Sequence, residues 1–95
     1  MKTIWKFVLA AEELQTIAMP ADATLLYARE QGNDICVWAE VETSHWAEFL
    51  QEDRTFEVFA TGQRWPDNAR AKRAYLGSAH LQGGALVFHV YERKP

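Results

Sequence analysis

The sequence predicts a mainly β fold: a small antiparallel barrel or strongly curved sheet of six to seven strands with one or two short helices. Three observations predict it. Short runs of β-prone residues alternate between apolar and polar side chains, turn residues separate these runs, and a clear helical period is found only around Trp46. The alternative is an α+β sheet with a helix packed on one face.

Length and composition favour a single domain over residues 1–95. Hydrophobic residues make up 48% and aromatic residues 13% of the chain, which is typical of a globular protein and argues against disorder. The four tryptophans and five phenylalanines can bury enough apolar area to offset the entropy of the ordered chain without a disulfide.

The N-terminal half is expected to form four strands, over Thr3–Leu9, Gln15–Met19, Ala23–Gln31 and Ile35–Glu42. The stretch between the first two is expected to be one helical turn or a wide connection. Pro20 ends the second strand because proline cannot donate to a sheet ladder, and Gly32-Asn33-Asp34 supplies the turn before the fourth. The fourth strand alternates strictly, so its core face is expected to be Ile35, Val37, Ala39 and Val41.

The C-terminal half begins with a change of period. Within Thr43–Asp53 three apolar residues recur at helical spacing, which predicts a short helix over an open end of the sheet: Trp46, Phe49 and Leu50. A fifth strand is expected over Arg54–Thr61. A loop over Gly62–Arg73 follows, in which Asp67 would begin a helical turn.

The last strand pair, Tyr75–Glu92, is the clearest hairpin, with Gly83-Gly84 as its turn. A two-residue turn there pairs Leu81 with Leu86. The apolar face is then Gly77, Ala79, Leu81, Leu86, Phe88 and Val90. The opposite face holds Ser78, His80, Val87, His89 and Tyr91, with the two histidines as diagonal neighbours. A three-residue turn would separate the histidines.

The charge balance sets one loop apart from the rest of the chain. Between residues 64 and 73, four basic residues stand against Asp67 alone, a balance of +3: Arg64, Arg70, Lys72 and Arg73. The remaining residues hold 6 basic and 12 acidic side chains, a balance of −6, so the total is −3. Such a loop suits a phosphate or pyrophosphate group, and Trp65 within it suits stacking on a nucleobase. The alternative is a solvated loop with Trp65 folded onto the core.

Charge and hydropathy disfavour several function classes. The net charge of −3 argues against binding of duplex nucleic acid. No stretch approaches the ~20 apolar residues of a membrane span, and Lys6 interrupts the apolar run at the N-terminus, so a soluble cytoplasmic protein is expected. Cys36 is the only cysteine and is expected to be a buried apolar residue rather than a nucleophile. Small β domains pair through edge strands, which favours a homo-oligomer.

The histidines of the hairpin do not complete a catalytic or metal site in the sequence. Zinc needs three or four ligands, and no Cys or His spacing supplies the others. Acid–base chemistry would need a nucleophile or a paired carboxylate beside them. No catalytic residue, metal or cofactor is therefore predicted. Two roles remain open for the histidines, hydrogen bonding to a ligand and packing at a half-buried surface.

Three segments resemble a family of small proteins of tailed phages and prophages: I-W-K-F-V-L, T-F-E-V-F-A-T-G-Q and Y-L-G-S-A-H-L-Q-G-G-A-L-V-F-H-V-Y-E. Members have a W-K-F or W-K-Y start, a centre like F-x-V-F-G-T-G-H and an ending like H-G-G-A-L-V-F-H-V-F-E. This chain departs from the pattern at Ala60, Gln63 and Gln82, where the family often has Gly, His and His. Glutamine can hydrogen-bond but cannot change charge near neutral pH, which would alter a site built from the family's histidines.

The resemblance implies a phage-encoded protein that acts by binding in the cytoplasm of the infected bacterial host. Together with the basic loop, it leads to the expectation that the protein sequesters a small anionic, nucleotide-derived signal of host defence. The expected ligand-binding residues are Gln63, Arg64, Trp65, Arg70, Arg73, His80, His89 and Tyr91. One alternative is a protein–protein inhibitor or scaffold anchored by Trp46 and Trp65. A further alternative is a nucleotide-signal hydrolase with His80 or His89 as acid or base.

Overall fold

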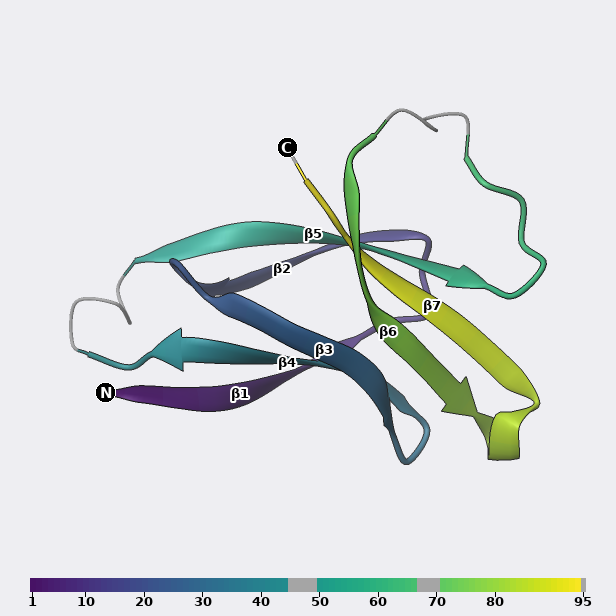
Figure 1. The fold of residues 1–95 in the computed structure, drawn as a ribbon, viewed down its shortest axis with the longest axis horizontal. Coiled ribbons are helices and arrows are strands. Elements are labelled where there is room, and N and C mark those ends of the chain that lie inside the picture. Colours follow the sequence, from purple (N-terminus) through teal and green to yellow (C-terminus); the bar gives the residue numbers. More distant parts are fainter. Residues whose placement is uncertain (45–49, 67–70, 95) are drawn as a thin grey trace.

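Seven strands and one 3₁₀ turn make up the structure, a computed structural model that describes residues 1–44, 50–66 and 71–94 (Figure 1). This confirms the prediction of a mainly β fold. The elements are β1 (Lys2–Leu9), β2 (Leu14–Pro20), β3 (Thr24–Gln31), β4 (Asp34–Glu42), β5 (Gln51–Ala60), β6 (Arg73–Leu81), η1 (Gln82–Gly84) and β7 (Leu86–Arg93).

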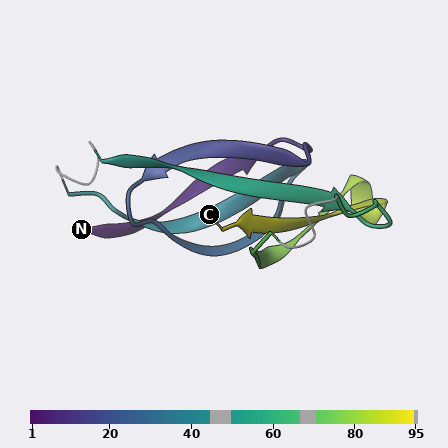
Figure 2. The same cartoon turned by 90° about the horizontal axis from the view of Figure 1, so that it is seen from above.

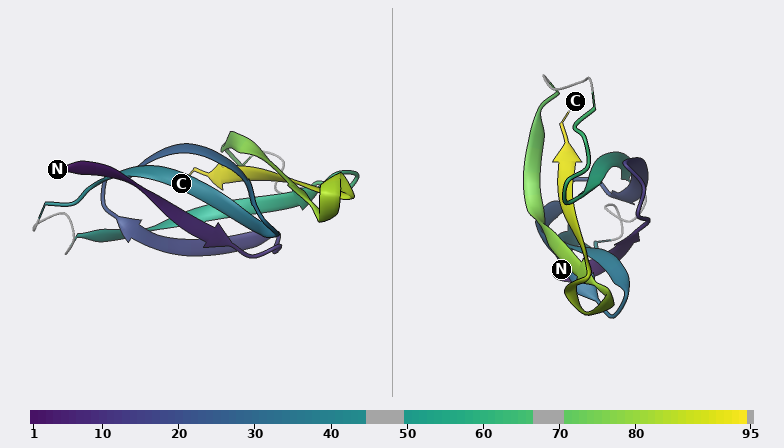
Figure 3. Two further views of the ribbon diagram at one scale, coloured as in Figure 1. Left: turned by 90° about the horizontal axis from the view of Figure 1, so that it is seen from below. Right: turned by 90° about the vertical axis from the view of Figure 1, so that its right-hand side faces the viewer.

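The strands form two antiparallel sheets rather than a closed barrel. The three-stranded sheet has the order β1-β4-β3, and the four-stranded sheet has the order β2-β5-β7-β6. Figures 2 and 3 show them as curved layers that face each other. β3 and β6 lie along each other without joining the two ladders. Both strands are bulged, β3 between Leu25 and Tyr27 and β6 between Tyr75 and Gly77. A bulge bends its strand and interrupts the pairing there.

The core lies between the inner faces of the two sheets. Strict alternation along β4 sends its four predicted core residues inward, and all of them are buried. Phe56 and Val58 of β5 and Val90 of β7 meet them from the other sheet. The predicted apolar face of the hairpin is confirmed in part: Ala79 and Val90 are fully buried, whereas Leu86 is 41% exposed. Cys36 is fully buried, as expected, although it belongs to the outer face of β4.

The predicted helices are not found among the described residues. Gln51, Glu52 and Asp53, expected to end a helix, instead form the start of β5 and pair with Pro20, Met19 and Ala18 of β2. Pairing with a partner strand outweighs the local helical period here. Trp46 with the rest of that helix, and the turn expected at Asp67, lie outside the described residues. In the described parts of the chain no helix has the length and apolar character needed to cross a bilayer.

The hairpin has the predicted register but a different turn. Leu81 pairs with Leu86 and His80 with Val87, as expected. The connection is a four-residue 3₁₀ turn, Gln82 to Ala85, rather than a two-residue turn. Gln82, Gly83 and Gly84 all have positive φ, at 51°, 65° and 95°. Two of these three left-handed positions are glycines, which enter that region without a steric penalty.

Contacts between β3 and β6 join the two sheets at one end. The backbone N–H of His80 donates a hydrogen bond to the Glu30 carboxylate at 2.9 Å. This bond is the main reason that the pKa of Glu30 lies below its ordinary value. Nearby, the Ala28 carbonyl lies directly over Gly77. The sheets are therefore linked here by a side chain and by close backbone packing rather than by a ladder.

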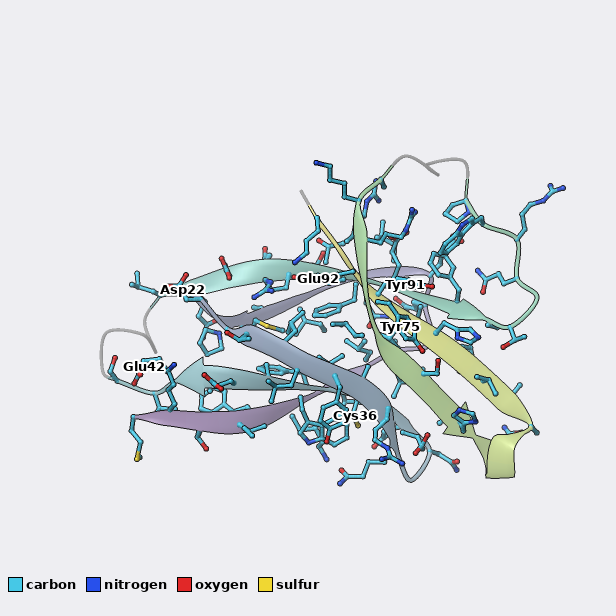
Figure 4. All side chains as sticks on the ribbon, in the orientation of Figure 1. Asp22, Cys36, Glu42, Tyr75, Tyr91 and Glu92 are labelled. Carbon is cyan, nitrogen blue, oxygen red and sulfur yellow. The ribbon has the colours of Figure 1, made fainter. Side chains whose placement is uncertain are left out.

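At the other end Arg54 of β5 connects the four-stranded sheet to the segment that leads into β3. Its Nη1 donates to the carbonyl oxygen of Ala23 at 2.8 Å, and its Nε donates at 2.5 Å to the carboxylate of Glu92 on β7, in the same sheet as β5. Figure 4 labels Glu92. Burial raises the pKa of Glu92, but the hydrogen bonds from Arg54 and Lys94 outweigh burial and hold this pKa below its ordinary value. The folded state therefore favours the ionised form of Glu92.

Acid is expected to weaken the fold through Glu92. A carboxyl whose pKa is lower in the folded than in the unfolded state adds stability above the unfolded pKa, and this stability is lost as the pH falls through the folded pKa. Glu92→Gln should therefore be less stable than the parent protein at neutral pH and should lose less stability on acidification. Urea unfolding between about pH 7 and about pH 3 measures how the free energy of unfolding changes with pH in the parent protein and in Glu92→Gln.

The comparison needs one control on an exposed, non-titrating side chain. Thr16→Val on the outer face of β2 should leave the pH slope of the parent protein unchanged. Equal slopes for the parent protein and Glu92→Gln would contradict the role assigned to this carboxylate.

Candidate functional site

The candidate site lies on the outer face of the four-stranded sheet, on β5, β7 and β6. Antiparallel pairing places Phe59 beside His89 and His89 beside Ser78 in one row. The next row brings together Glu57, Tyr91 and Tyr75. The chain after β5 passes over these rows, and Trp65 packs on them. We call the four rings Phe59, Trp65, Tyr75 and Tyr91 the aromatic face.

The rings of the aromatic face form a continuous cluster. Trp65 meets Phe59 edge-on, with centroids 4.5 Å apart, and Tyr91 at 5.7 Å. Tyr75 lies 5.3 Å from Tyr91 on the other side (Figure 4). Phe59 is buried beneath Trp65, but Trp65 and Tyr75 remain 48% and 57% exposed. The cluster therefore offers two half-exposed rings that are held in place by ring contacts.

A buried ion pair supports the aromatic face from below. Arg73 donates from Nε to the Glu57 carboxylate at 2.6 Å and from Nη2 at 3.2 Å, in a bidentate arrangement. The side chains are only 8% and 2% exposed. The guanidinium carbon of Arg73 also lies 4.9 Å from the centroid of the Trp65 ring, within cation–π range. Arg73 thus ties Trp65 to the sheet.

Four polar side chains form a hydrogen-bonded series beside the aromatic face. The hydroxyl oxygens of Tyr75 and Ser78 are 2.6 Å apart, and Ser78 Oγ is 3.0 Å from Nδ1 of His89. Nε2 of His89 is 2.8 Å from the hydroxyl oxygen of Thr61. Both ring nitrogens of His89 are therefore bonded to hydroxyl groups. We call this series the hydroxyl relay.

The contact between Ser78 and His89 has the distance of a nucleophile–base pair, but its surroundings differ from those of a hydrolytic triad. The second nitrogen of His89 bonds a neutral hydroxyl, whereas a triad places a carboxylate there to orient and stabilise the imidazolium. The Ser78 oxygen is also shared with Tyr75. Among the described residues, no group of three or more His, Cys, Asp or Glu side chains is placed to hold a metal ion. The arrangement is suited to hydrogen bonding.

The structure brings together four of the predicted site residues: Trp65, Arg73, His89 and Tyr91. Arg73, expected to meet a phosphate, pairs with Glu57 in this structure, and its role as a phosphate contact stays a prediction. His80 lies on the same side of β6 as Ser78 and is exposed at the far end of the hairpin. Arg64 is exposed beside Trp65. Arg70 lies outside the described residues.

Gln63 has a local structural role at the end of β5. Its side-chain carbonyl accepts a hydrogen bond from the backbone N–H of Ala60 at 3.0 Å, and its amide nitrogen donates to Glu13 at 3.3 Å. Its backbone N–H donates a hydrogen bond to the Ala60 carbonyl. Gln63 therefore closes the turn that leads into the loop and directs Trp65 back over the sheet.

Sequence reasoning did not assign a site role to several residues that the structure places there: Glu57, Phe59, Thr61, Tyr75 and Ser78. A signal existed for two of them. Glu57 and Phe59 alternate with the core residues Phe56 and Val58, so both were bound to lie on the outer face of β5. Their burial depends on Trp65, which packs over this face, and the alternation of the strand does not predict this contact.

Two hollows of the surface lie beside the Arg54–Glu92 ion pair. They measure about 490 Å³ and 470 Å³, and both are lined by Arg54, Glu92 and Lys94. Tyr75 borders the second hollow. The predicted site residues line neither of these two hollows.

Comparison with known proteins gives a family without an assigned activity. No curated protein and no solved structure shows significant similarity to the chain. A family model described as a domain of unknown function, DUF7352, matches residues 1–95. Since the match spans the whole sequence, the chain belongs to the DUF7352 family.

Proposed function

We propose that the protein acts by binding and that the aromatic face is its binding surface, with a planar, negatively charged ligand of nucleotide type. The observation that carries the proposal is the pair of half-exposed rings, Trp65 and Tyr75, fixed on one sheet face. A nucleobase stacks on such rings with little dependence on its identity. The resemblance to tailed-phage proteins leads us to propose a phage or prophage origin and a signal of host defence as the ligand.

Two basic side chains in the covering segment are the proposed phosphate contacts. Arg64 directly precedes Trp65, and Lys72 directly precedes Arg73, and both are exposed. Arg73 is not used in this way, because its guanidinium already holds the buried Glu57 carboxylate. Its proposed role is to orient Trp65. His89 and Tyr91 would border the ligand, and the Tyr75 hydroxyl would offer it a hydrogen bond.

Isothermal titration with a panel of cyclic and ADP-ribose-type nucleotides tests the proposal. At least one nucleotide should bind, and Trp65→Ala and Tyr75→Ala should each weaken that binding by about 5- to 150-fold, the range for loss of one base–aromatic stack. Arg64→Ala should weaken binding and reduce its dependence on salt.

Tyr27→Ala is the matched control for these variants. Tyr27 is 44% exposed and stacks on Trp38 at 5.0 Å, but it lies on the three-stranded sheet. Its replacement should leave nucleotide binding unchanged. An absence of heat with every nucleotide, or equal losses in Tyr27→Ala and Tyr75→Ala, would remove the support for a nucleotide ligand.

A protein partner is the second candidate, and the two half-exposed rings of the aromatic face favour it. Exposed Trp and Tyr side chains beside arginine are the composition of interface hot spots. In that case Trp65 would be an anchor. A partner captured from host lysate should be lost with Trp65→Ala and Tyr75→Ala and retained with Tyr27→Ala. Retention of the same partner by all three variants would exclude the aromatic face as the surface that binds this partner.

A homo-oligomer formed through an edge strand remains a prediction. In the described residues β1 has β4 as its neighbour on one side and no paired strand on the other. The backbone groups on the free side of β1 could pair with a second copy of the chain. Sedimentation velocity on the full chain measures the oligomeric state directly.

A further inference from the structure

Relative donor strength favours one direction for the hydroxyl relay when His89 is neutral. A phenol is a stronger hydrogen-bond donor than an aliphatic hydroxyl, which favours Tyr75 as the donor and Ser78 as the acceptor in their 2.6 Å contact. Ser78 then uses its own proton to donate to Nδ1 of His89. Nδ1 is therefore the acceptor of the ring, and the ring proton is on Nε2.

The far end of the relay agrees with this direction. With its proton on Nε2, the ring donates to the Thr61 oxygen at 2.8 Å. The Thr61 hydroxyl is then free to donate to the Val87 carbonyl, which lies 3.5 Å away. In this direction Tyr75 only donates, Ser78 and Thr61 each accept one hydrogen bond and donate one, and the Val87 carbonyl only accepts. The Tyr75 hydroxyl has used its only proton, and it faces solvent with acceptor lone pairs alone.

We propose that protonation of His89 reverses the first half of this relay and converts the Tyr75 hydroxyl from an acceptor into a donor toward solvent. A protonated imidazole donates from both nitrogens. Nδ1 then donates to Ser78, whose proton loses its acceptor on the ring and turns toward the Tyr75 oxygen at the other end of their 2.6 Å contact. The Tyr75 hydroxyl then no longer donates to Ser78, and its proton turns toward solvent. A proton taken up at His89 thus changes the hydrogen-bonding character of an exposed ring on the neighbouring strand.

The charged and titratable groups around His89 come from all the elements packed against it. On its own strand the neighbour on the same face is Tyr91, and on β5 it is Glu57, whose charge is balanced by Arg73. On β6 the neighbours are Tyr75 and His80. The segment after β5 carries the exposed Arg64, next to Trp65 in the sequence. Among the described residues, Ser78 and Thr61 are the ones whose side chains bond the His89 ring, so their two hydroxyls respond when the ring gains a proton.

The consequence for ligand binding rests on the proposed function. A phosphate oxygen accepts hydrogen bonds and cannot donate them when fully ionised. Tyr75 would therefore repel it when His89 is neutral and bind it when His89 is protonated. Histidine side chains take up a proton between about pH 8 and pH 5, so binding of an anion at Tyr75 should strengthen on mild acidification.

Nuclear magnetic resonance of the ligand-free protein tests the relay itself. The nitrogen shifts of His89 should show the proton on Nε2 in the neutral ring. The Tyr75 Cζ shift should titrate with the same midpoint as His89 in the parent protein, and this coupling should be lost in Ser78→Ala. The Cζ of Tyr91 is the internal control, because Tyr91 is not part of the relay. A neutral ring with its proton on Nδ1, or coupling that survives in Ser78→Ala, would overturn the proposal.

Titration with ADP-ribose tests the consequence. The parent protein should bind it about tenfold more tightly near pH 5.5 than near pH 8, the worth of one hydrogen bond to a charged acceptor. Ser78→Ala retains the charge of His89 but breaks the relay, so it should retain less than about a threefold change. Equal pH dependence in both proteins would overturn the reversal. If ADP-ribose binds to neither protein, the proposed ligand is wrong, and the ligand-free shifts alone decide the relay.

Discussion

Replacing Arg73 with methionine is expected to lower the free energy of unfolding by about 3–5 kcal/mol. The Glu57 side chain is 2% exposed and is held by two hydrogen bonds from Arg73. Without the guanidinium, a carboxylate would remain buried beneath Trp65 with no opposite charge to compensate its lost hydration. Urea unfolding followed by circular dichroism measures the difference.

Two further variants separate the buried charge from lost packing. The double variant Glu57→Met/Arg73→Met removes both charges and should be more stable than Arg73→Met alone, because an apolar pair of similar size needs no desolvation of ions. The matched control is Arg64→Met at an exposed site, which should stay within about 0.5 kcal/mol of the parent protein. A loss below about 1 kcal/mol in Arg73→Met would show that the pair is not a structural support.

Gly77→Ala is expected to destabilise the fold by about 2–6 kcal/mol. A Cβ atom at Gly77 would lie 2.1 Å from the carbonyl oxygen of Ala28, far inside van der Waals contact with a backbone atom. Gly77 also has φ of 150°, which L-residues rarely adopt. The added methyl group would force β6 away from β3, so hydrogen exchange in both strands should accelerate.

Gly62→Ala is the matched control for the conformational part of this effect. Gly62 also has positive φ, at 86°, but a Cβ there would meet nothing within 4 Å. Its replacement should therefore cost only about 1–2 kcal/mol, the penalty of the left-handed backbone alone. If Gly62→Ala and Gly77→Ala were equally destabilised, the close approach of β6 to β3 would contribute nothing.

The strands could be predicted because their pattern is local. Alternation along Asp34–Glu42 assigns one face to the core whatever the partner strand, and the four predicted residues on that face are buried. The register of the last hairpin follows from the glycine pair and the same alternation, and Leu81 does pair with Leu86. The start of β5 was missed because its strand conformation comes from pairing with β2, a segment some 30 residues earlier in the sequence.

The candidate site was predicted less well, and the reason is electrostatic. Arg73 belongs to a basic cluster in the sequence, and a cluster of this kind indicates an anion site. The partner that it finds is Glu57, 16 positions earlier on β5, and a buried carboxylate nearby binds a guanidinium before any ligand does. A local count of charge contains no information about such a distant partner.

The sequence by itself determined most of the strands, the core face of β4 and that the two hairpin histidines share a face, because each follows from the two-residue period of a strand and from turn chemistry. Only the tertiary structure decided that two sheets form instead of a barrel and that Trp65 lies over a buried ion pair. It also decided that His89 bonds two hydroxyls from different strands. These features depend on contacts between segments distant in the chain, and their energies are set by burial and geometry that appear only when the sheets pack.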